Sequence, residues 1–241
     1  LKLTPHINLW GVFFDLYFKL FYIFLMSQYK DFLKNFEKAV LESKRSIEEV
    51  ELIAVSKRKP IENILPIISE GQLSFGENQI QEVKQKWPLI KNDHSKIKLH
   101  FIGSIQSKKL DDIIHHCDVI HTIDREKLVL IIAKLDKSIL QNKTFFIQVN
   151  TGNEPQKSGV DLKKVEEFIQ LCKNYKINID GLMCLPPENE LPDKHFQILQ
   201  SLAKNNHIKY LSMGMTDDYH AALKYGATHI RVGTAIFGTR D

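Results

Sequence analysis

The sequence predicts a single-domain α/β protein with a TIM-like (β/α)8 barrel, and three observations lead to this fold class. From about residue 30 onwards, short apolar segments alternate with segments whose apolar residues recur at helical spacing. Eight apolar segments can be counted, and no second change of composition separates them. Short apolar strands between helices indicate a parallel sheet, and eight such units in roughly 215 residues fit one barrel.

The expected elements follow one another in regular order. An amphipathic helix comes first, and strands are then expected at 52–56, 73–76, 98–102, 118–123, 145–150, 179–184, 210–213 and 229–232. Helices are expected between them at 61–70, 79–87, 107–116, 124–140, 161–175, 193–204 and 216–225, with a short turn after the last strand. Pro60 and Gly71 bracket the first of these helices. Asp124 and Asp161 are the expected N-caps of two others.

The competing architecture is an open, doubly wound parallel sheet. Such a sheet normally has fewer strands and a glycine-rich turn after the first of them. Here the first strand runs into Lys57-Arg58-Lys59-Pro60, which contains no glycine and cannot cradle a dinucleotide. The sequence therefore favours the closed barrel.

Composition and charge restrict the class of function. The 241 residues carry a net charge of only +4, and the lysines are scattered, which argues against a dedicated nucleic-acid surface. The cysteines Cys117, Cys172 and Cys184 are odd in number and follow no pattern. They indicate a reducing compartment without a disulfide framework, so we expect a cytoplasmic protein.

The first 25 residues differ from the rest, because they form an apolar, aromatic run interrupted by Asp15 and Lys19. A membrane anchor is one interpretation, since the run approaches the ~20 residues that a bilayer helix needs, but both charges oppose it. A secretory signal would need a small-residue cleavage site, which is not found after the run. We favour an extension, 1–25, outside the fold, and a barrel domain over 26–241 that begins at Met26. A membrane role is expected only if the extension is real.

The residues that directly follow the strands should share one rim, which carries the active site in barrels of this type. Lys57 follows the first strand there, and apolar surroundings can lower the pKa of an amine and ready it to capture a carbonyl as a Schiff base. The alternative is an ordinary surface lysine in a solvated basic cluster. The other expected rim residues are Glu77, Asn78, Gly103, Ser104, Thr122, Asn150, Met183, the run 212–215, Gly233 and Thr234.

Small and hydroxyl-bearing residues follow the last two strands. Ser212, Gly214, Gly233 and Thr234 occupy the two loops in which phosphate-binding barrels hold the anion. Small residues let backbone N–H groups approach an anion. Glycine and serine also close many tight turns that bind nothing, so a phosphate site is one of two interpretations.

Arg231 lies two residues before Gly233 in the last strand, so the two share a face and Arg231 points into the barrel mouth if Gly233 lines the site. A buried arginine needs an acceptor, which could be an internal partner such as Glu77 or a ring nitrogen of a bound heterocycle. A lysine, a phosphate cup and an inward arginine on one rim fit pyridoxal 5′-phosphate (PLP), with its aldehyde at Lys57 and its ring nitrogen at Arg231. An arginine there keeps that nitrogen unprotonated, which weakens carbanion chemistry.

The order of short motifs resembles that of a known family. The motifs are Ala54-Val55-Ser56-Lys57, Phe75-Gly76-Glu77-Asn78 with Gln81-Glu82, His100-Phe101-Ile102-Gly103 with Gln106-Ser107-Lys108, Thr122-Ile123-Asp124, Asn150 with Glu154 and Lys157-Ser158-Gly159, Gly181-Leu182-Met183, Leu211-Ser212-Met213-Gly214-Met215 with Asp217-Asp218, and Arg231-Val232-Gly233-Thr234-Ala235-Ile236-Phe237-Gly238. With these motifs, residues 26–241 resemble the pyridoxal phosphate homeostasis protein family, which is itself similar to the N-terminal barrel domain of alanine racemase.

The resemblance implies which residues hold a cofactor. It implies that PLP is held on Lys57 as a Schiff base, that Arg231 faces the ring nitrogen, and that Asn78 lies near the ring. It also implies that the phosphate is surrounded by Ser212, Gly214, Met215, Gly233 and Thr234. The departures from the family pattern involve none of these positions; they are Ser104, Lys109 and the pair Gln79-Ile80.

The resemblance implies a function as well. We expect a protein that carries and buffers PLP and so maintains vitamin B6 and amino-acid homeostasis, without robust catalysis of its own. PLP-dependent client enzymes are further expected partners, and a monomer or weak dimer is the expected state.

Two catalytic alternatives remain open. A single-domain racemase could use Lys57 on one face of the substrate carbon, but two-base racemisation needs a second group opposite. Racemases of this fold take that group, a tyrosine, from a second domain, for which we expect no room after Gly238. A Schiff-base aldolase would use the same lysine without a cofactor, but it needs an acid/base, and Arg231 stays protonated.

A metal site is disfavoured. The run His115-His116-Cys117-Asp118 matches the spacing of no closed zinc set, so a structural role is expected for it. His121 is expected to be a core or rim residue.

Overall fold

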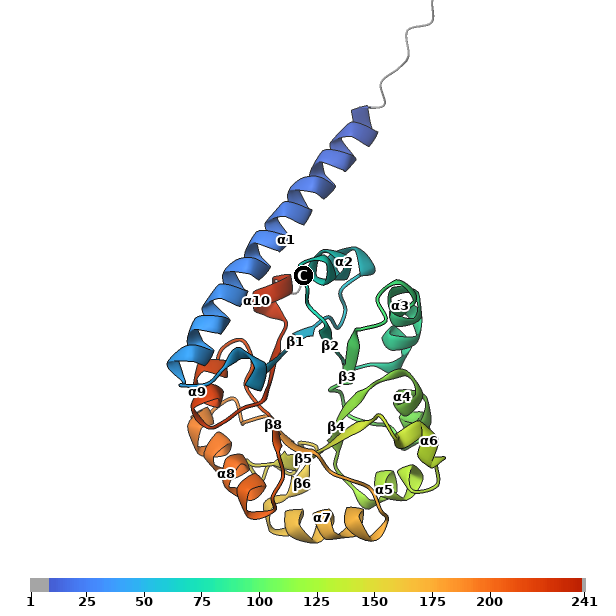
Figure 1. Ribbon diagram of the computed structural model, residues 1–241, viewed down its shortest axis with the longest axis vertical. Helices are drawn as coiled ribbons and strands as arrows, with labels where there is room; N and C mark the ends of the chain where they lie inside the picture. The colour runs from blue at the N-terminus through green and yellow to red at the C-terminus, as the bar shows by residue number, and fades with distance from the viewer. Residues whose placement is uncertain (1–8, 240–241) are drawn as a thin grey trace, which may run out of the picture.

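The strands of the computed structural model form a closed ring, which confirms the predicted barrel (Figure 1). The structure describes the backbone of residues 9–239, together with the side chains of residue 20 and residues 22–239. Neighbouring strands are parallel, and the last pairs with the first to close the ring. In order around the barrel they are β1 (Glu51–Val55), β2 (Ser74–Glu77), β3 (Lys98–Phe101), β4 (Val119–Ile123), β5 (Thr144–Asn150), β7 (Gly181–Cys184), β8 (Tyr210–Ser212) and β9 (His229–Val232).

Helices surround the ring on its outside (Figure 1). They are α1 (Leu9–Glu42), α2 (Ile61–Ser69), α3 (Ile80–Asp93), α4 (Leu110–His116), α5 (Glu126–Ile132), α6 (Lys137–Leu140), α7 (Val165–Asn174), α8 (Pro192–Asn205), α9 (Tyr219–Lys224) and α10 (Thr234–Phe237), with single 3-10 turns at Ile47–Glu49, Ser107–Lys109 and Leu162–Lys164. A short extra strand, β6 (Val160–Asp161), pairs with the end of β5. Two residues are too few to show the alternation that marks a strand in sequence.

The helix expected over 124–140 is wrong as one continuous element, because the structure has α5 and α6 there. Asp136 separates them: its side chain accepts a hydrogen bond from the backbone N–H of Ser138 and caps α6. Asp124 is not the N-cap of α5, since that position belongs to Arg125, whose guanidinium pairs with the Asp124 carboxylate. Asp161 does act as a cap, and it accepts from the N–H of Lys163.

Two apolar cores of unequal size fill the molecule. The large one lies between the strands and the surrounding helices and includes Phe75, whose ring packs at a tilt against that of Trp87. The small one consists of Val119, Phe146 and Met183, with Tyr210 packed against it. Buried polar side chains are numerous as well, and they include His100, His121, His229, Ser212 and Arg231. All five lie on strands, so the interior of the barrel contains polar groups that can form hydrogen bonds with one another.

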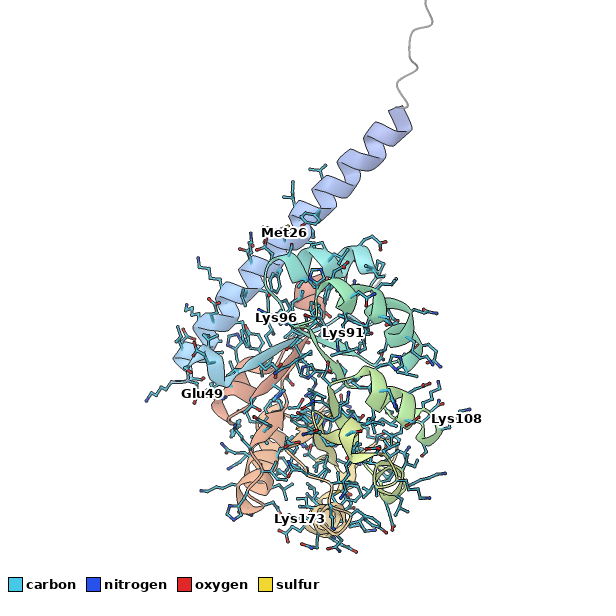
Figure 2. All side chains as sticks on the ribbon, turned by 45° about the vertical axis from the view of Figure 1, so that its right-hand side comes forward. Met26, Glu49, Lys91, Lys96, Lys108 and Lys173 are labelled. Atoms are coloured by element: carbon cyan, nitrogen blue, oxygen red, sulfur yellow. The ribbon has the colours of Figure 1, made fainter. Side chains whose placement is uncertain are left out.

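Helix α1 crosses the boundary that was predicted between an extension and the barrel. Its later part packs on the barrel, where Phe32 and Phe36 contact Tyr219 of α9. Figure 2 shows Met26 on the stretch of α1 that reaches the barrel. The side chain of Leu25 is buried, whereas Ile23 and Phe24 are exposed.

The division into 1–25 and 26–241 stays a prediction, because most side chains of the first segment lie outside the described residues. Within the described part of the chain, the structure contains no helix whose length and apolar character would let it cross a bilayer.

Candidate functional site

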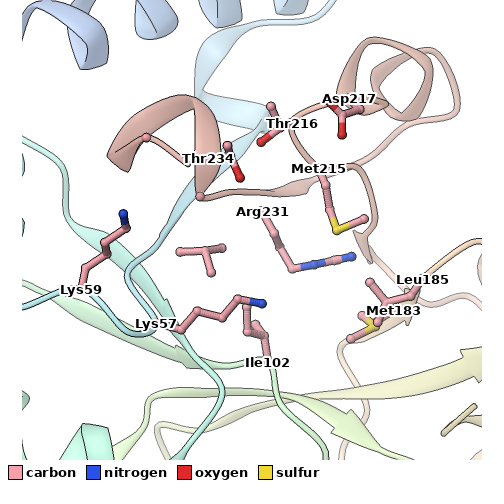
Figure 3. A pocket seen from close by; sticks show the side chains of 13 residues that line it. Lys57, Lys59, Ile102, Met183, Leu185, Met215, Thr216, Asp217, Arg231 and Thr234 are labelled. Atoms are coloured by element: carbon pink, nitrogen blue, oxygen red, sulfur yellow. The ribbon is translucent and has the colours of Figure 1, made fainter. Parts of the chain in front are cut away.

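Six of the predicted site residues and rim residues border one cavity at the carboxyl ends of the strands (Figure 3). They are Lys57, Met183, Met215, Arg231, Gly233 and Thr234. The cavity has a volume of about 230 Å³, which suits a small molecule. Its lining is completed by residues that are not among the expected rim or site residues, namely Val55, Lys59, Ile102, Leu185, Thr216, Asp217 and Gly238.

The three basic residues after β1 have three different environments. Lys57 is half-buried, and Figure 3 shows its side chain pointing into the cavity on the side where Arg231 lies. Arg58 is exposed, with a positive φ of 61°. Lys59 turns away, and its Nζ donates to the carbonyl oxygen of Phe237 at 3.0 Å. The cluster is therefore not a uniform solvated patch, because only Lys57 offers its amine to the centre of the cavity.

Arg231 is the second charged group of the site. Its side chain is 4% exposed. Nη1 donates to the Ser212 hydroxyl at 2.6 Å and Nη2 donates to the carbonyl oxygen of Cys184 at 3.0 Å. Burial lowers the pKa of the guanidinium, but arginine starts so high that it keeps its proton.

The alternative partner suggested for Arg231, Glu77, is not its partner in the structure. Glu77 is fully buried and forms an ion pair with Lys86 of α3, with 2.7 Å between Nζ and Oε1. The sequence could not show this, because the two residues meet only when α3 packs against the outer side of β2. Arg231 instead uses a hydroxyl and a carbonyl, both neutral acceptors.

A chain of polar side chains leads from Arg231 down through the barrel. Ser212 Oγ lies 2.9 Å from Nδ1 of His121, and Nε2 of His121 lies 3.0 Å from Nδ1 of His100. The other ring nitrogen of His100 lies 3.4 Å from Oε1 of Glu51, at the start of β1. The side chains of Ser212, His121 and His100 are fully buried, so these polar groups run through the interior of the barrel from Arg231 toward its opposite end.

One set of proton positions satisfies this chain. Ser212 accepts from Arg231 and donates to Nδ1 of His121, whose Nε2–H then donates to His100. This arrangement requires a neutral His121, and burial does lower the pKa of that ring well below its usual value. The donors then all point the same way, from the cationic Arg231 toward the acidic Glu51.

The residues predicted to surround a phosphate are only partly brought together. Gly233, Thr234 and Met215 line the cavity, and Thr216 joins them. Ser212 does not, because its hydroxyl is engaged within the barrel.

Gly214 is also absent from the lining, and its conformation explains why glycine is needed there. Its φ is +92°, and a Cβ at this position would meet the Cβ of Ala222 at 2.6 Å. Gly214 therefore allows the loop to pack closely on α9.

Asn78 lies apart from the main cavity. It borders a neighbouring cavity of about 210 Å³, together with Gln79, Ser104 and Gln106. Its Oδ1 is buried, and no hydrogen-bond partner for it is found among the described residues. Sequence reasoning placed Asn78 on the correct rim but could not tell which side of the strand ends it faces.

Two other rim residues stabilise loops. The Thr122 hydroxyl donates to the carbonyl oxygen of Gly103 at 2.6 Å, and the Asn150 amide donates to that of Glu154 at 2.8 Å. Across the described residues, no group of three or more His, Cys, Asp or Glu side chains is arranged to hold a metal ion.

The sequence contained a weak signal for some of the missed residues. Thr216 directly follows the predicted Met215, but it was assigned to the start of a helix, whereas α9 begins only at Tyr219. Ile102 and Leu185 are apolar residues just after strands, a position that many packing residues share. Their role as cavity walls depends on the curvature of the closed barrel.

The arrangement defines a class of protein before any comparison is made. It is a single (β/α)8 barrel with a lysine beyond its first strand and a buried arginine in its last strand, both facing one small cavity. A primary amine held in such a place can capture a carbonyl compound, and the fixed cation and the hydroxyl groups of Thr216 and Thr234 can orient it.

Comparison with known proteins identifies the family. Residues 32–241 match the family model described as alanine racemase, N-terminal domain. The pyridoxal phosphate homeostasis protein of Vibrio alginolyticus is 40% identical over 210 residues, which cover 82% of this chain and 89% of the relative. The chain therefore belongs to the family of pyridoxal phosphate homeostasis proteins, within the larger alanine racemase N-terminal-domain family.

Solved structures agree. PipY of Synechococcus elongatus, in a structure with PLP bound, is 32% identical, covers 84% of this chain and 98% of its own, and superposes with a TM-score of 0.68. The structure of PipY without PLP gives a TM-score of 0.74 at 30% identity, with coverage of 79% and 93%. The alanine racemase of Bacillus anthracis shares the fold, with a TM-score of 0.57 at 15% identity; the match covers 84% of this chain and 55% of the racemase.

Proposed function

We propose that this protein binds PLP reversibly through Lys57 and thereby carries and buffers the cofactor. The observation that carries the proposal is the position of Lys57, whose side chain enters a small cavity that also contains the buried guanidinium of Arg231. When bound, PLP supplies an aldehyde that condenses with a primary amine, so that C=N replaces C=O and one water leaves.

The chain's own residues fit that ligand in three respects. Lys57 offers the amine. Arg231 stays protonated and can donate to a ring nitrogen, because it is already fixed by Ser212 and the carbonyl of Cys184. Thr216 and Thr234 also line the cavity, and Figure 3 shows them across it from Lys57, where their hydroxyl groups can hold a phosphate.

The relatives support the same proposal, since they are named for pyridoxal phosphate homeostasis and one related structure holds PLP. We propose that Ser212 and Gly214 act indirectly: Ser212 fixes Arg231, and Gly214 lets its loop approach α9. That Asn78 lies near the ring stays a prediction. Transfer of the cofactor to client enzymes belongs to the same proposal.

We further propose that the protein does not turn over amino acids efficiently. Two-base chemistry needs an acid/base opposite Lys57. Of the described residues that line the cavity, none is a tyrosine, histidine or cysteine. Asp217 is a carboxylate at the cavity wall, and Figure 3 shows it on the far side of the cavity from Lys57.

The proposal is tested by visible absorbance after addition of PLP. The parent protein should turn yellow, and Lys57→Ala should lose the band entirely. Lys108→Ala, which removes an exposed lysine outside the cavity, should keep it. A full band in Lys57→Ala would contradict the proposal, and its loss in Lys59→Ala alone would identify Lys59 as the anchor. Exchange of the α-proton of alanine in D2O tests the non-enzymatic role, and sustained turnover would support a racemase.

A further inference from the structure

The segment that carries Lys57 is held from outside the barrel by side chains of α3. Residues 56–59 form a tight turn in which the N–H of Lys59 donates to the carbonyl oxygen of Ser56 at 3.0 Å. Arg58 sits at its tip with a φ of 61°, a conformation that a non-glycine residue adopts only when its surroundings impose it. The contacts that impose it come from three ionisable residues.

Lys86 binds the turn on both sides of Lys57. Its Nζ donates to the carbonyl oxygen of Ser56 at 3.1 Å and to that of Lys59 at 3.2 Å. One ammonium group therefore joins the first and the last residue of the turn. Its side chain comes from the buried face of α3 and is only 10% exposed.

Two glutamates complete this group. Oε1 of Glu77 lies 2.7 Å from Nζ of Lys86 and also accepts from the Ser56 hydroxyl at 2.8 Å. Glu82 lies 3.2 Å from the same Nζ, and both of its carboxylate oxygens accept from the backbone N–H of Arg58, at 3.0 and 2.9 Å. Ser56, Arg58 and Lys59 are therefore each tied to Glu77, Glu82 or Lys86.

Stability alone does not explain such a group. Burying a charge costs free energy, and a protein is often as stable or more stable when well-packed apolar residues replace a buried ion pair. Lysine and glutamate are almost never this deeply buried without a partner. The contacts that distinguish this group from a simple ion pair are those to the backbone of 56–59.

We propose that Lys86, Glu77 and Glu82 are positioning residues that fix the 56–59 turn so that the amine of Lys57 projects into the cavity. None of the three is among the residues that line the cavity. Without them the turn relaxes, Lys57 samples other directions, and covalent capture of an aldehyde weakens while the rest of the cavity is unaffected. This inference rests on the proposed role of Lys57.

The test compares two ligands that differ only at the reacting carbon. PLP can attach to Lys57, whereas 4′-deoxypyridoxine 5′-phosphate has no aldehyde and reports only on Arg231 and the phosphate end. In the double variant Lys86→Met/Glu77→Gln, which removes both buried ionisable groups, we expect PLP to bind about tenfold more weakly or worse, a factor equivalent to about 1.4 kcal/mol. The deoxy compound should bind within about twofold of the parent, because its contacts are retained.

The matched control is Lys84→Met. Lys84 lies on the same helix but is about half-exposed and pairs with Asp112 at 3.1 Å, away from the turn. Both ligands should bind to this variant as they do to the parent. Thermal unfolding of all variants shows whether the double variant folds. If it does not, Glu82→Gln, at a more exposed position, should show the same selective loss to a smaller extent.

The outcomes separate the two ideas. Equal losses for both ligands, or no loss for PLP in a folded variant, would overturn the positioning role. A parent protein that binds both ligands equally and shows no visible band would instead overturn the attachment to Lys57, and with it the proposed function.

Discussion

Lys57 and Arg231 are held in the site by opposite means. Lys57 lies in a turn that is hydrogen-bonded, from outside the barrel, to ionisable residues of α3 and of the end of β2. Arg231 is held from inside the barrel by Ser212, followed by the buried rings of His121 and His100. The first arrangement is ionic and acts on backbone atoms, and the second is a directional chain that requires neutral imidazole.

The difference follows from what each group has to do. In the proposed function Lys57 presents a reactive amine, and the fixed backbone of the turn directs its side chain into the cavity. Arg231 only has to donate hydrogen bonds in a fixed direction, so the protein fixes the side chain itself. The two arrangements also make different demands on pH, because one depends on a buried carboxylate and the other on a buried imidazole.

The largest expected effect comes from breaking the inner chain. In His121→Phe, the ring still stacks on Phe146, whose centroid is 4.4 Å away, but the hydroxyl of Ser212 and Nδ1 of His100 lose their partner. We expect the free energy of unfolding to fall by roughly 2–4 kcal/mol, since the Ser212 hydroxyl loses its acceptor and Nδ1 of His100 loses its donor in the buried interior. Urea titration followed by circular dichroism measures the free energy of unfolding. A loss below about 0.5 kcal/mol would show that the hydrogen bonds between Ser212, His121 and His100 do not stabilise the fold together.

The next effect concerns Glu77 and pH. Burial raises the pKa of Glu77 to about 7, against the pull of Lys86, from an ordinary value of 4.5. Between these values the folded state keeps a proton that the unfolded chain has released. Stability attributable to Glu77 should therefore fall as pH rises through this range, by at most about 3 kcal/mol. The difference in unfolding free energy between the parent and Glu77→Gln measures it, and a pH-independent difference would refute it.

His121 should behave with the opposite sign. Burial lowers its pKa well below the ordinary 6.5, so it is neutral in the folded protein. As pH falls below 6.5, His121 binds a proton in the unfolded chain but not in the folded protein. The free energy of unfolding therefore decreases. Comparison of the parent with His121→Phe isolates this contribution, which should vanish above about pH 7.5. If both sites gave slopes of the same sign, the contrast between the two sides of the cavity would be wrong.

The smallest expected effect is at the far end of the cavity. Thr216→Ala removes one hydroxyl from the lining and should weaken the binding of 4′-deoxypyridoxine 5′-phosphate by about three- to tenfold, the worth of one hydrogen bond. Ser201→Ala, on the exposed side of α8, serves as the control. Equal binding by all three proteins would remove Thr216 from the phosphate end.

The sequence was most informative where a side chain follows directly from a strand. Lys57 beyond the first strand and Arg231 within the last could be assigned to one rim, because the period of a strand and the order of strands in a closed barrel fix both positions. The same reasoning found Met215, Gly233 and Thr234. It also gave the number of strands in the ring, although not the short β6.

Sequence reasoning failed where the contact depends on packing between distant elements. Glu77 pairs with Lys86 only because α3 is rotated about its axis so that Lys86 faces β2. Ser212, His121 and His100 line up only because their three strands, which are far apart in the chain, are shifted along one another by the right amount. Asn78 shows the limit clearly, since it follows β2 as predicted yet borders the neighbouring cavity. No local pattern encodes such relations.

The central claim is that Lys57 is the residue to which the carbonyl ligand attaches. The direct measurement is to load the protein with PLP, reduce with borohydride, digest, and locate the modified lysine by peptide mass analysis. We predict a single modified peptide that carries its label on Lys57, with Lys59 unmodified. A label on another lysine, or none on a protein that has bound PLP, would contradict this assignment.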